Sequence, residues 1–169
     1  MQTAFVVEDI HAAIAQYTGA LNAGPWFLRE HGVFPRQTYR GAPVATELSI
    51  AMAYSGDMLI ELIQQHDAGP SVYRDVVAER GFGLHHFGIA CEDYAAACAD
   101  WAARGWAMVY EAEVAHGARV GYFEGALPFM VELIELKPAG RAMFDGFRAA
   151  HADWAGGVEI RPLAPVPGR

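Results

Sequence analysis

The chain carries one pattern twice, and this repeat limits the folds that it can adopt. The segment QTAFVVEDIHAA, which begins at Gln2, matches HFGIACEDYAAA, which begins at His86, at a constant spacing of 84 positions. The segments LIELIQ and MVELIE form a second matching pair, in which Glu61 and Glu132 are 71 positions apart. Each of these glutamates interrupts an apolar run. The sequence therefore predicts a duplication, with two similar modules that share one plan.

Length and composition favour one compact unit that handles small molecules. The 169 residues are 53% hydrophobic and 19% charged, which is enough apolar material for a substantial core. A net charge of -8 argues against nucleic acid or an anionic membrane surface as partner, because both attract clustered Lys and Arg. Because we find neither an apolar run of membrane-spanning length nor a signal peptide, we expect a cytoplasmic protein. The two cysteines lack metal-ligand spacing and are assigned no chemistry.

The first module, residues 1–65, reads as strand, helix, strand, strand, strand. Residues 2–8 form the first strand, and Asp9 is placed to cap a helix whose apolar residues recur at helical spacing. Further strands are predicted at 26–30, 48–54 and 58–64.

The second module, residues 83–137, repeats that order after a linker helix within residues 66–82. Its strands are predicted at 84–91, 106–114, 119–124 and 129–136, and its helix at 93–104. Residues 138–169 should form a C-terminal helix, followed from Arg161 by an irregular proline-rich tail. The fold class is therefore α+β, built from paired βαβββ modules.

The alternation of side chains along each strand points to a polar site. Ile60 and Leu62 share one face of their strand, so Glu61 lies on the other, and the same holds for Glu132. If the aliphatic faces pack on helices, both glutamates face the hollow side of the sheet together with Gln2 and His86. Two carboxylates, an imidazole and a carboxamide would suit a divalent cation.

Each of these residues also has a simpler interpretation. Glu61 and Glu132 would be ordinary solvent-facing residues on half-exposed strands, and Gln2 would fray with the terminus. By strict alternation His85 points to the face opposite His86 and serves as a hydrogen-bonded structural residue. His116 is most simply an ordinary loop residue, and the alternative is that it reaches the mouth of the cup.

The paired modules, with HHFGIACEDY opening the second and IELIQ and VELIE closing them, resemble the vicinal oxygen chelate superfamily of glyoxalases, bleomycin-resistance proteins and dioxygenases. Within it the chain is most similar to the methylmalonyl-CoA epimerase and glyoxalase I (lactoylglutathione lyase) branch. The resemblance implies a curved mixed sheet around a cup-shaped site, where a metal holds two neighbouring substrate oxygens.

Carried over by position, the four ligand places of the family fall on Gln2, Glu61, His86 and Glu132. Gln2 stands where a histidine is usual, while the epimerases use a glutamine at the place of Glu61. A second glutamate base of the epimerases has no clear match here, and Glu47 is the nearest residue.

Module one is longer than module two by 13 positions, and the excess falls within WFLREHGVFPRQTYRGAP. This segment combines aromatic residues with Arg29, Arg36 and Arg40 in an otherwise acidic protein. It would be either a flap that supplies stacking and anion-binding groups to a substrate, or an ordinary long hairpin loop.

These features lead us to expect a metal-dependent isomerase or lyase that acts on a small carbonyl or acyl-thioester compound through an enolate. Glu132 would be the catalytic base and Glu61 a second ligand or proton acceptor, with Mn, Co, Ni, Mg or Zn as the cation. One alternative is a ring-cleaving dioxygenase, which would need two histidines and one carboxylate. Another is a metal-free binding or resistance protein with an apolar, aromatic cup. Exposed strand edges would favour a homodimer.

Overall fold

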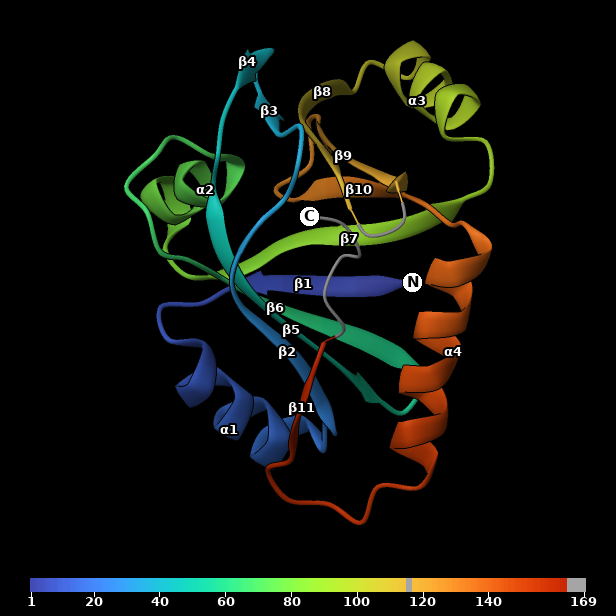
Figure 1. The fold of residues 1–169 in the computed structure, drawn as a ribbon. Helices are drawn as coiled ribbons and strands as arrows, with labels where there is room; N and C mark the ends of the chain where they lie inside the picture. The colour runs from blue at the N-terminus through green and yellow to red at the C-terminus, as the bar shows by residue number, and fades with distance from the viewer. Residues whose placement is uncertain (115–116, 164–169) are drawn as a thin grey trace.

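The computed structural model describes residues 1–114 and 117–163 (Figure 1), so His116 and the tail beyond Leu163 lie outside the described residues. Within these residues the elements of the first half, in chain order, are β1 (Gln2–Val6), α1 (Ile10–Leu21), β2 (Trp26–Val33), β3 (Thr38–Tyr39), β4 (Ala42–Pro43), β5 (Glu47–Ser55) and β6 (Met58–Gln65). Those that follow are α2 (Val72–Arg80), β7 (Gly83–Cys91), α3 (Tyr94–Ala103), β8 (Ala107–Glu113), β9 (Arg119–Glu124), β10 (Met130–Glu135), α4 (Pro138–Ala152) and β11 (Ile160–Pro162).

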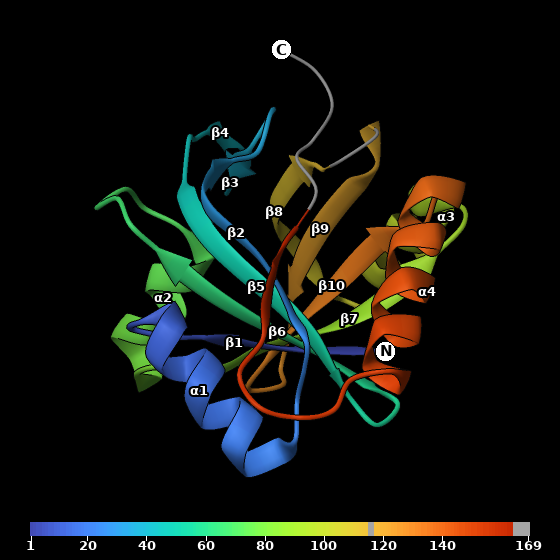
Figure 2. The ribbon, with the colours of Figure 1, turned by 60° about the horizontal axis from the view of Figure 1, so that its bottom comes forward.

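All the described strands belong to one mixed sheet, in the order β11-β2-β5-β6-β1-β7-β10-β9-β8-β3-β4. Each module contributes four main strands, and the two sets join where β1 pairs antiparallel with β7. In each module the first strand runs parallel to the last, β1 with β6 and β7 with β10. The sheet curves strongly around a central space (Figure 2). The predicted α+β class and the tandem βαβββ plan are confirmed.

The convex face of the sheet is covered by the helix of each module, as the alternation predicts. Ile60 and Leu62 are fully buried in a cluster with α1, and Leu133 is buried against α3. Asp9 and Asp93 cap these helices, since their carboxylates accept hydrogen bonds from the backbone N–H three residues later. None of the helices in the described part of the chain is both long and apolar enough to cross a bilayer.

Segments exchanged between the two halves cover the outer edges of the sheet. The module-one insertion extends across to module two, where Thr38 and Tyr39 of β3 pair with β8. The irregular tail was predicted to begin at Arg161, but Arg161 and Pro162 instead belong to β11 (Ile160–Pro162), which runs parallel to β2. The exposed backbone groups of β2 explain this difference, because Trp26 N–H donates to Glu159 O and Leu28 O accepts from Leu163 N–H. Dimer formation was predicted from exposed strand edges and stays a prediction. Part of each of these edges is covered, the edge of β2 by β11 and the edge of β8 by β3.

Candidate metal centre

Four side chains converge at the base of the concave face. Gln2 lies on β1, Glu61 on β6, His86 on β7 and Glu132 on β10. Their exposed fractions are only 3%, 4%, 0% and 5%, so neither glutamate is the solvent-facing residue of the simpler interpretation. The structure therefore brings together all four residues that the sequence predicts as ligands, and their function as ligands stays a prediction.

Two small residues lie beneath this group, at equivalent places in the two modules. Gly88 lies between Gln2 and Glu132, because it pairs with both across neighbouring strands. Ala4 lies 84 positions before Gly88, at the equivalent place in module one. It lies in the same way between Glu61 and His86. A Cβ on Gly88 would lie only 3.0 Å from the Cβ of Gln2 and 3.1 Å from Oε2 of Glu132. The absent side chain therefore leaves room for the carboxylate.

The polar atoms are within reach of one another. Gln2 Nε2 donates to Glu61 Oε2 at 2.7 Å. His86 Nε2 is 3.2 Å from Glu132 Oε2 and 3.5 Å from Glu61 Oε2. One ligand atom from each of Glu61, His86 and Glu132 can be chosen so that all three lie within 4.8 Å of one another. This spacing allows a single cation to contact all three.

The electrostatics of the group fit a divalent cation. Burial and the nearby Glu132 charge raise the pKa of Glu61. Burial lowers the pKa of His86, but the charges of Glu132 and Glu61 outweigh it and raise that pKa to about 9. Without a cation, a protonated His86 would thus balance part of the carboxylate charge. A divalent ion would replace that proton and neutralise both carboxylates.

Two atoms of the group have no hydrogen-bond partner in the part of the chain that the structure describes. Among the described residues, Gln2 Oε1 and His86 Nε2 are buried polar atoms that lack a hydrogen-bond partner, since the close approach of His86 to the carboxylates has poor geometry. Such atoms are costly unless something else satisfies them. Oxygen and imidazole nitrogen are suitable ligands for Mn, Co, Ni, Mg or Zn. The residues present therefore fit a metal, with Gln2 able to turn its amide oxygen inward.

His85 differs from its sequence prediction because β7 contains a bulge. Ala4 pairs with His86 and Phe5 with Leu84, so His85 is an extra residue in the ladder between β1 and β7. A bulge redirects side chains that strict alternation would send to opposite faces. The prediction that His85 faces away from His86 was therefore wrong, although it is a buried, hydrogen-bonded residue as expected.

A cavity of about 930 Å³, including open solvent at its mouth, lies above the polar group. Gln2, Glu61 and Glu132 line its base. Most of its wall is apolar or aromatic, with contributions from both modules and from α4, and it includes Phe34, Ile50, Met52, Tyr110, Tyr122, Met143 and Phe144. The arrangement is a polar centre at the base of a largely apolar cup.

A comparison with known families now adds to this geometry. The family model described as glyoxalase/bleomycin resistance protein/dioxygenase superfamily matches residues 1–122. The chain belongs to this superfamily. The family predicted from the sequence is thereby confirmed.

Solved structures share the superfamily fold with this chain. Methylmalonyl-CoA epimerase from Mycobacterium tuberculosis is 19% identical, with a TM-score of 0.58 over 83% of this chain and 89% of the epimerase. A hypothetical protein from Bacillus halodurans C-125 is 22% identical, with a TM-score of 0.59 over 80% and 92% of the two chains. A Streptomyces coelicolor methylmalonyl-CoA epimerase variant, in complex with 2-nitronate-propionyl-CoA, is 15% identical, with a TM-score of 0.54 over 79% and 93%. No curated protein matches the sequence significantly.

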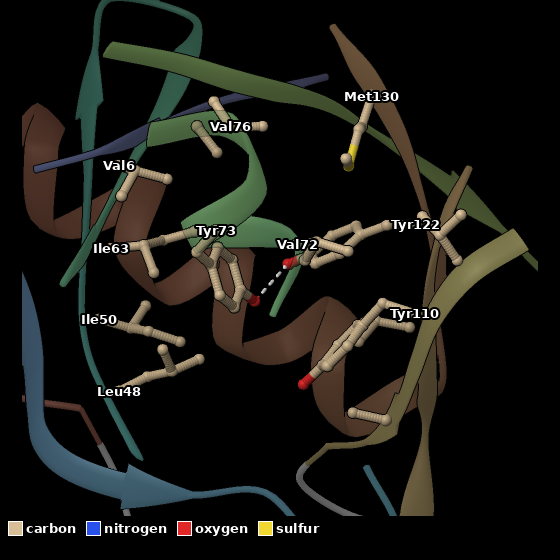
Figure 3. Close-up of a cluster of buried hydrophobic side chains, with 14 residues drawn as sticks. Val6, Leu48, Ile50, Ile63, Val72, Tyr73, Val76, Tyr110, Tyr122 and Met130 are labelled. Atoms are coloured by element: carbon tan, nitrogen blue, oxygen red, sulfur yellow. Dashed lines mark hydrogen bonds between the residues drawn. The ribbon is translucent and has the colours of Figure 1, made fainter. Parts of the chain in front are cut away.

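The sequence analysis missed an aromatic group in the site of this superfamily member. Tyr73 of α2 reaches the concave side, where its hydroxyl is 3.2 Å from that of Tyr122 (Figure 3). Tyr122 lies beside His86, with ring centroids 4.7 Å apart, and is stacked on Tyr110. Tyr110 and Tyr122 could have been found from register, because Tyr122 pairs with Glu132 and Tyr110 pairs with Tyr122. Nothing in the linker sequence indicates the direction of Tyr73.

Glu47, the nearest sequence match to a further epimerase base, lies elsewhere. Its carboxylate is 2.5 Å from Nδ1 of His31, and it does not belong to the described cavity lining.

Of the arginines in the insertion, Arg36 and Arg40 pair with carboxylates outside the cavity lining, whereas Arg29 lines the cavity.

Proposed function

We propose that this superfamily member is a metal-dependent isomerase or lyase that acts on a small carbonyl or acyl-thioester compound through an enolate. The observation that supports this most directly is the buried group of Glu61, His86 and Glu132, whose ligand atoms can lie within 4.8 Å of one another. Similarity to epimerases is consistent with the proposal, although at this level of identity it indicates the fold alone.

The same four residues would supply both the ligands and the base. Gln2, Glu61, His86 and Glu132 would hold the cation, which when bound would stabilise negative charge on two neighbouring substrate oxygens. Glu132 would take the proton from the carbon next to the substrate carbonyl and return it, either to the same carbon or to its neighbour. The apolar cup would exclude water and strengthen the electrostatic interactions at its base.

Metal binding is the first test. Protein purified without a histidine tag should contain, or take up, roughly one divalent cation per chain, and Mn, Co, Ni, Mg or Zn should raise its melting temperature. Absence of bound metal together with absence of stabilisation by every one of these ions would rule out the metal-dependent reaction.

Proton exchange is the second test and needs no known substrate. The metal-loaded protein is incubated in D₂O with panels of α-hydroxy ketones, hemithioacetals and 2-substituted acyl thioesters. Deuterium incorporation is followed by NMR. We expect metal-dependent exchange at the carbon next to the carbonyl of at least one class.

The apolar cup supports a second candidate, a metal-free binding or resistance protein. If the metal-loaded protein binds apolar compounds but catalyses no proton exchange, the binding or resistance function is favoured. A ring-cleaving dioxygenase is less consistent with the donor set, since His86 is the one histidine of the group among the described residues and His85 instead contacts His86 and Val72.

A further inference from the structure

Arg29 is a cation in the cavity wall that has no ion-pair partner among the described residues. Its side chain is half-buried, and within the described residues no carboxylate forms an ion pair with it. Its Nε is shielded from solvent and has no hydrogen-bond partner in that part of the chain. By contrast Arg36 and Arg40, from the same insertion, pair with Glu113 and Glu124. In a protein of net charge -8, a half-buried arginine that no described carboxylate pairs with needs an explanation.

The side chain of Arg29 is held in place by its neighbours. Its guanidinium carbon is 4.3 Å from the centroid of the Phe34 ring, which also lines the cavity. A Cβ on Gly32 would lie 2.8 Å from Arg29 Nε, so the absence of a side chain there makes room for the arginine. The ladder between β2 and β5 is irregular between Arg29 and Gly32, and such irregularities often occur beside functional sites. Arg29 is therefore positioned by the local structure.

Strand register places Arg29 near the polar centre but apart from it. Met52 pairs with both Phe27 and Glu61, so these three residues form one row across the sheet. Arg29 lies two residues beyond Phe27 on the same face. On a flat sheet this would separate the Cα atoms of Arg29 and Glu61 by about 12 Å. A ligand in the cup could thus contact both Arg29 and the base of the site.

The position and the chemistry of Arg29 specify an anionic ligand. The burial of Arg29 lowers its pKa and the charge of Glu61 raises it, but an arginine stays protonated in proteins. A cation bound at the centre would neutralise the charge of Glu61, so that Glu61 would no longer compensate the positive charge of Arg29. The planar guanidinium presents parallel donors that match a carboxylate.

We propose that Arg29 binds a carboxylate of the substrate, separate from the two oxygens held at the base of the cup. The apolar wall between Arg29 and the base would contact the rest of the molecule. The substrate would therefore be an apolar carbonyl compound that also carries a remote carboxylate. This substrate class rests on the proposed function, whereas the anion site itself does not.

The test measures the binding of a simple apolar acid by calorimetry. The probes are 3-phenylpropionate, its uncharged amide and a phenylalkyl phosphonate, each titrated into metal-free protein. We expect the carboxylate to bind on the order of 10- to 100-fold more tightly than the amide, as charged hydrogen bonds allow. R29M should abolish this preference, and R36M, a matched control on the same segment, should retain it.

A second variant retains the positive charge and displaces it. G32A should push Arg29 Nε aside and weaken carboxylate binding without changing the net charge. Circular dichroism checks that each variant is folded. Equal binding of acid and amide by the wild type, unchanged binding by both R29M and G32A, or tighter binding of the phosphonate would each overturn the proposal. Because these titrations contain no metal, they can succeed or fail independently of metal binding and exchange.

Discussion

The Nδ1 atoms of His85 and His86 are 2.8 Å apart, and this contact determines which nitrogen of His86 faces the carboxylates. Nε2 of His85 is 3.3 Å from the carbonyl oxygen of Val72, which can only accept, so Nε2 must carry a proton. Burial and the nearby His86 charge hold the pKa of His85 well below its usual value, so this ring is neutral and its Nδ1 accepts. His86 Nδ1 therefore donates, and Nε2 is directed toward Glu61 and Glu132.

This chain of hydrogen bonds makes His85 a positioning residue for His86. H85F retains a buried ring but removes both hydrogen bonds, and we expect metal affinity to fall roughly 10- to 100-fold, as for outer partners of ligating histidines. H85Q, which retains a donor and an acceptor, should recover part of this loss. Calorimetry with Zn or Mn measures affinity, and ¹⁵N NMR of the metal-free protein, recorded above pH 9 where His86 is neutral, reports the His86 tautomer. An unchanged tautomer in H85F would contradict the positioning function.

Glu132 is expected to act as the base, and E132Q retains its shape without its charge or basicity. Deuterium exchange should slow by about 10² to 10⁴, the usual contribution of a general base. E61Q is the matched comparison, because Glu61 occupies the equivalent place in module one and should mainly weaken metal binding. Exchange that is undiminished in E132Q but lost in metal-saturated E61Q would reverse the two assignments.

Gly88 should tolerate no larger residue without moving Glu132. G88A would place a methyl group 3.1 Å from Oε2 of Glu132, and we expect metal affinity to fall on the order of tenfold while the protein remains folded. G19A is the control, since its added methyl group meets no atom within 4 Å. An alanine in that helix should raise stability by about 0.5–1 kcal/mol. Equal metal affinities of G88A and the wild type would show that the carboxylate has more freedom than the structure indicates.

Asp67, in the linker directly after module one, should make the stability of the protein depend on acidic pH. Burial raises the pKa of its carboxyl, but hydrogen bonds from Glu47 N–H and Gly69 N–H outweigh burial and lower that pKa. A lowered folded-state pKa stabilises the protein above the unfolded-state value near 3.8, and this stabilisation is lost as pH falls through the folded-state value.

D67N should therefore cost about 1 kcal/mol at pH 7, a modest value because the site is partly open to solvent. The difference from wild type should shrink in acid. Urea unfolding at several pH values measures it, with D145N on the exposed part of α4 as the control. A pH-independent difference would mean that the amide perturbs packing instead.

Oligomeric state is a separate question that light scattering answers directly. We expect a homodimer at working concentration, as predicted from the open edges of paired β modules. A monomer would fit the partial covering of those edges by β3 and β11.

The candidate centre was predictable because it depends on two regular properties of the sequence. The repeat aligned Glu61 with Glu132 and Gln2 with His86, and the two-residue alternation of strands then placed all four on one face. The starts of the helices after Asp9 and Asp93 were predictable for a similarly local reason, since a carboxylate can satisfy free N–H groups wherever a helix begins.

Features that depend on contacts between distant segments were not predictable. The bulge at His85 arises from how β7 meets β1, and a shift of one residue reverses the face of a side chain. The strand at Ile160–Pro162 exists because β2 offers an unpaired edge, which no local pattern near Pro162 reveals. Composition alone could not decide whether the insertion is a flap over the site or an ordinary long loop. The features that bear on this choice are its pairing with β8 and the place of Arg29 in the cavity wall, and both are contacts with distant segments.

The pairing of Trp26 with Ile160 has a consequence for how the protein is made. A ribosome adds about 5–20 residues per second, so β2 waits on the order of 6 to 26 s before its outer neighbour is synthesised. Throughout that interval a nascent chain presents a bare β edge, which is a template for unwanted association with other nascent chains. Long-range pairing of this kind also forms slowly once both partners exist. The edge of β2 is thus a part of the nascent chain that chaperones would shield.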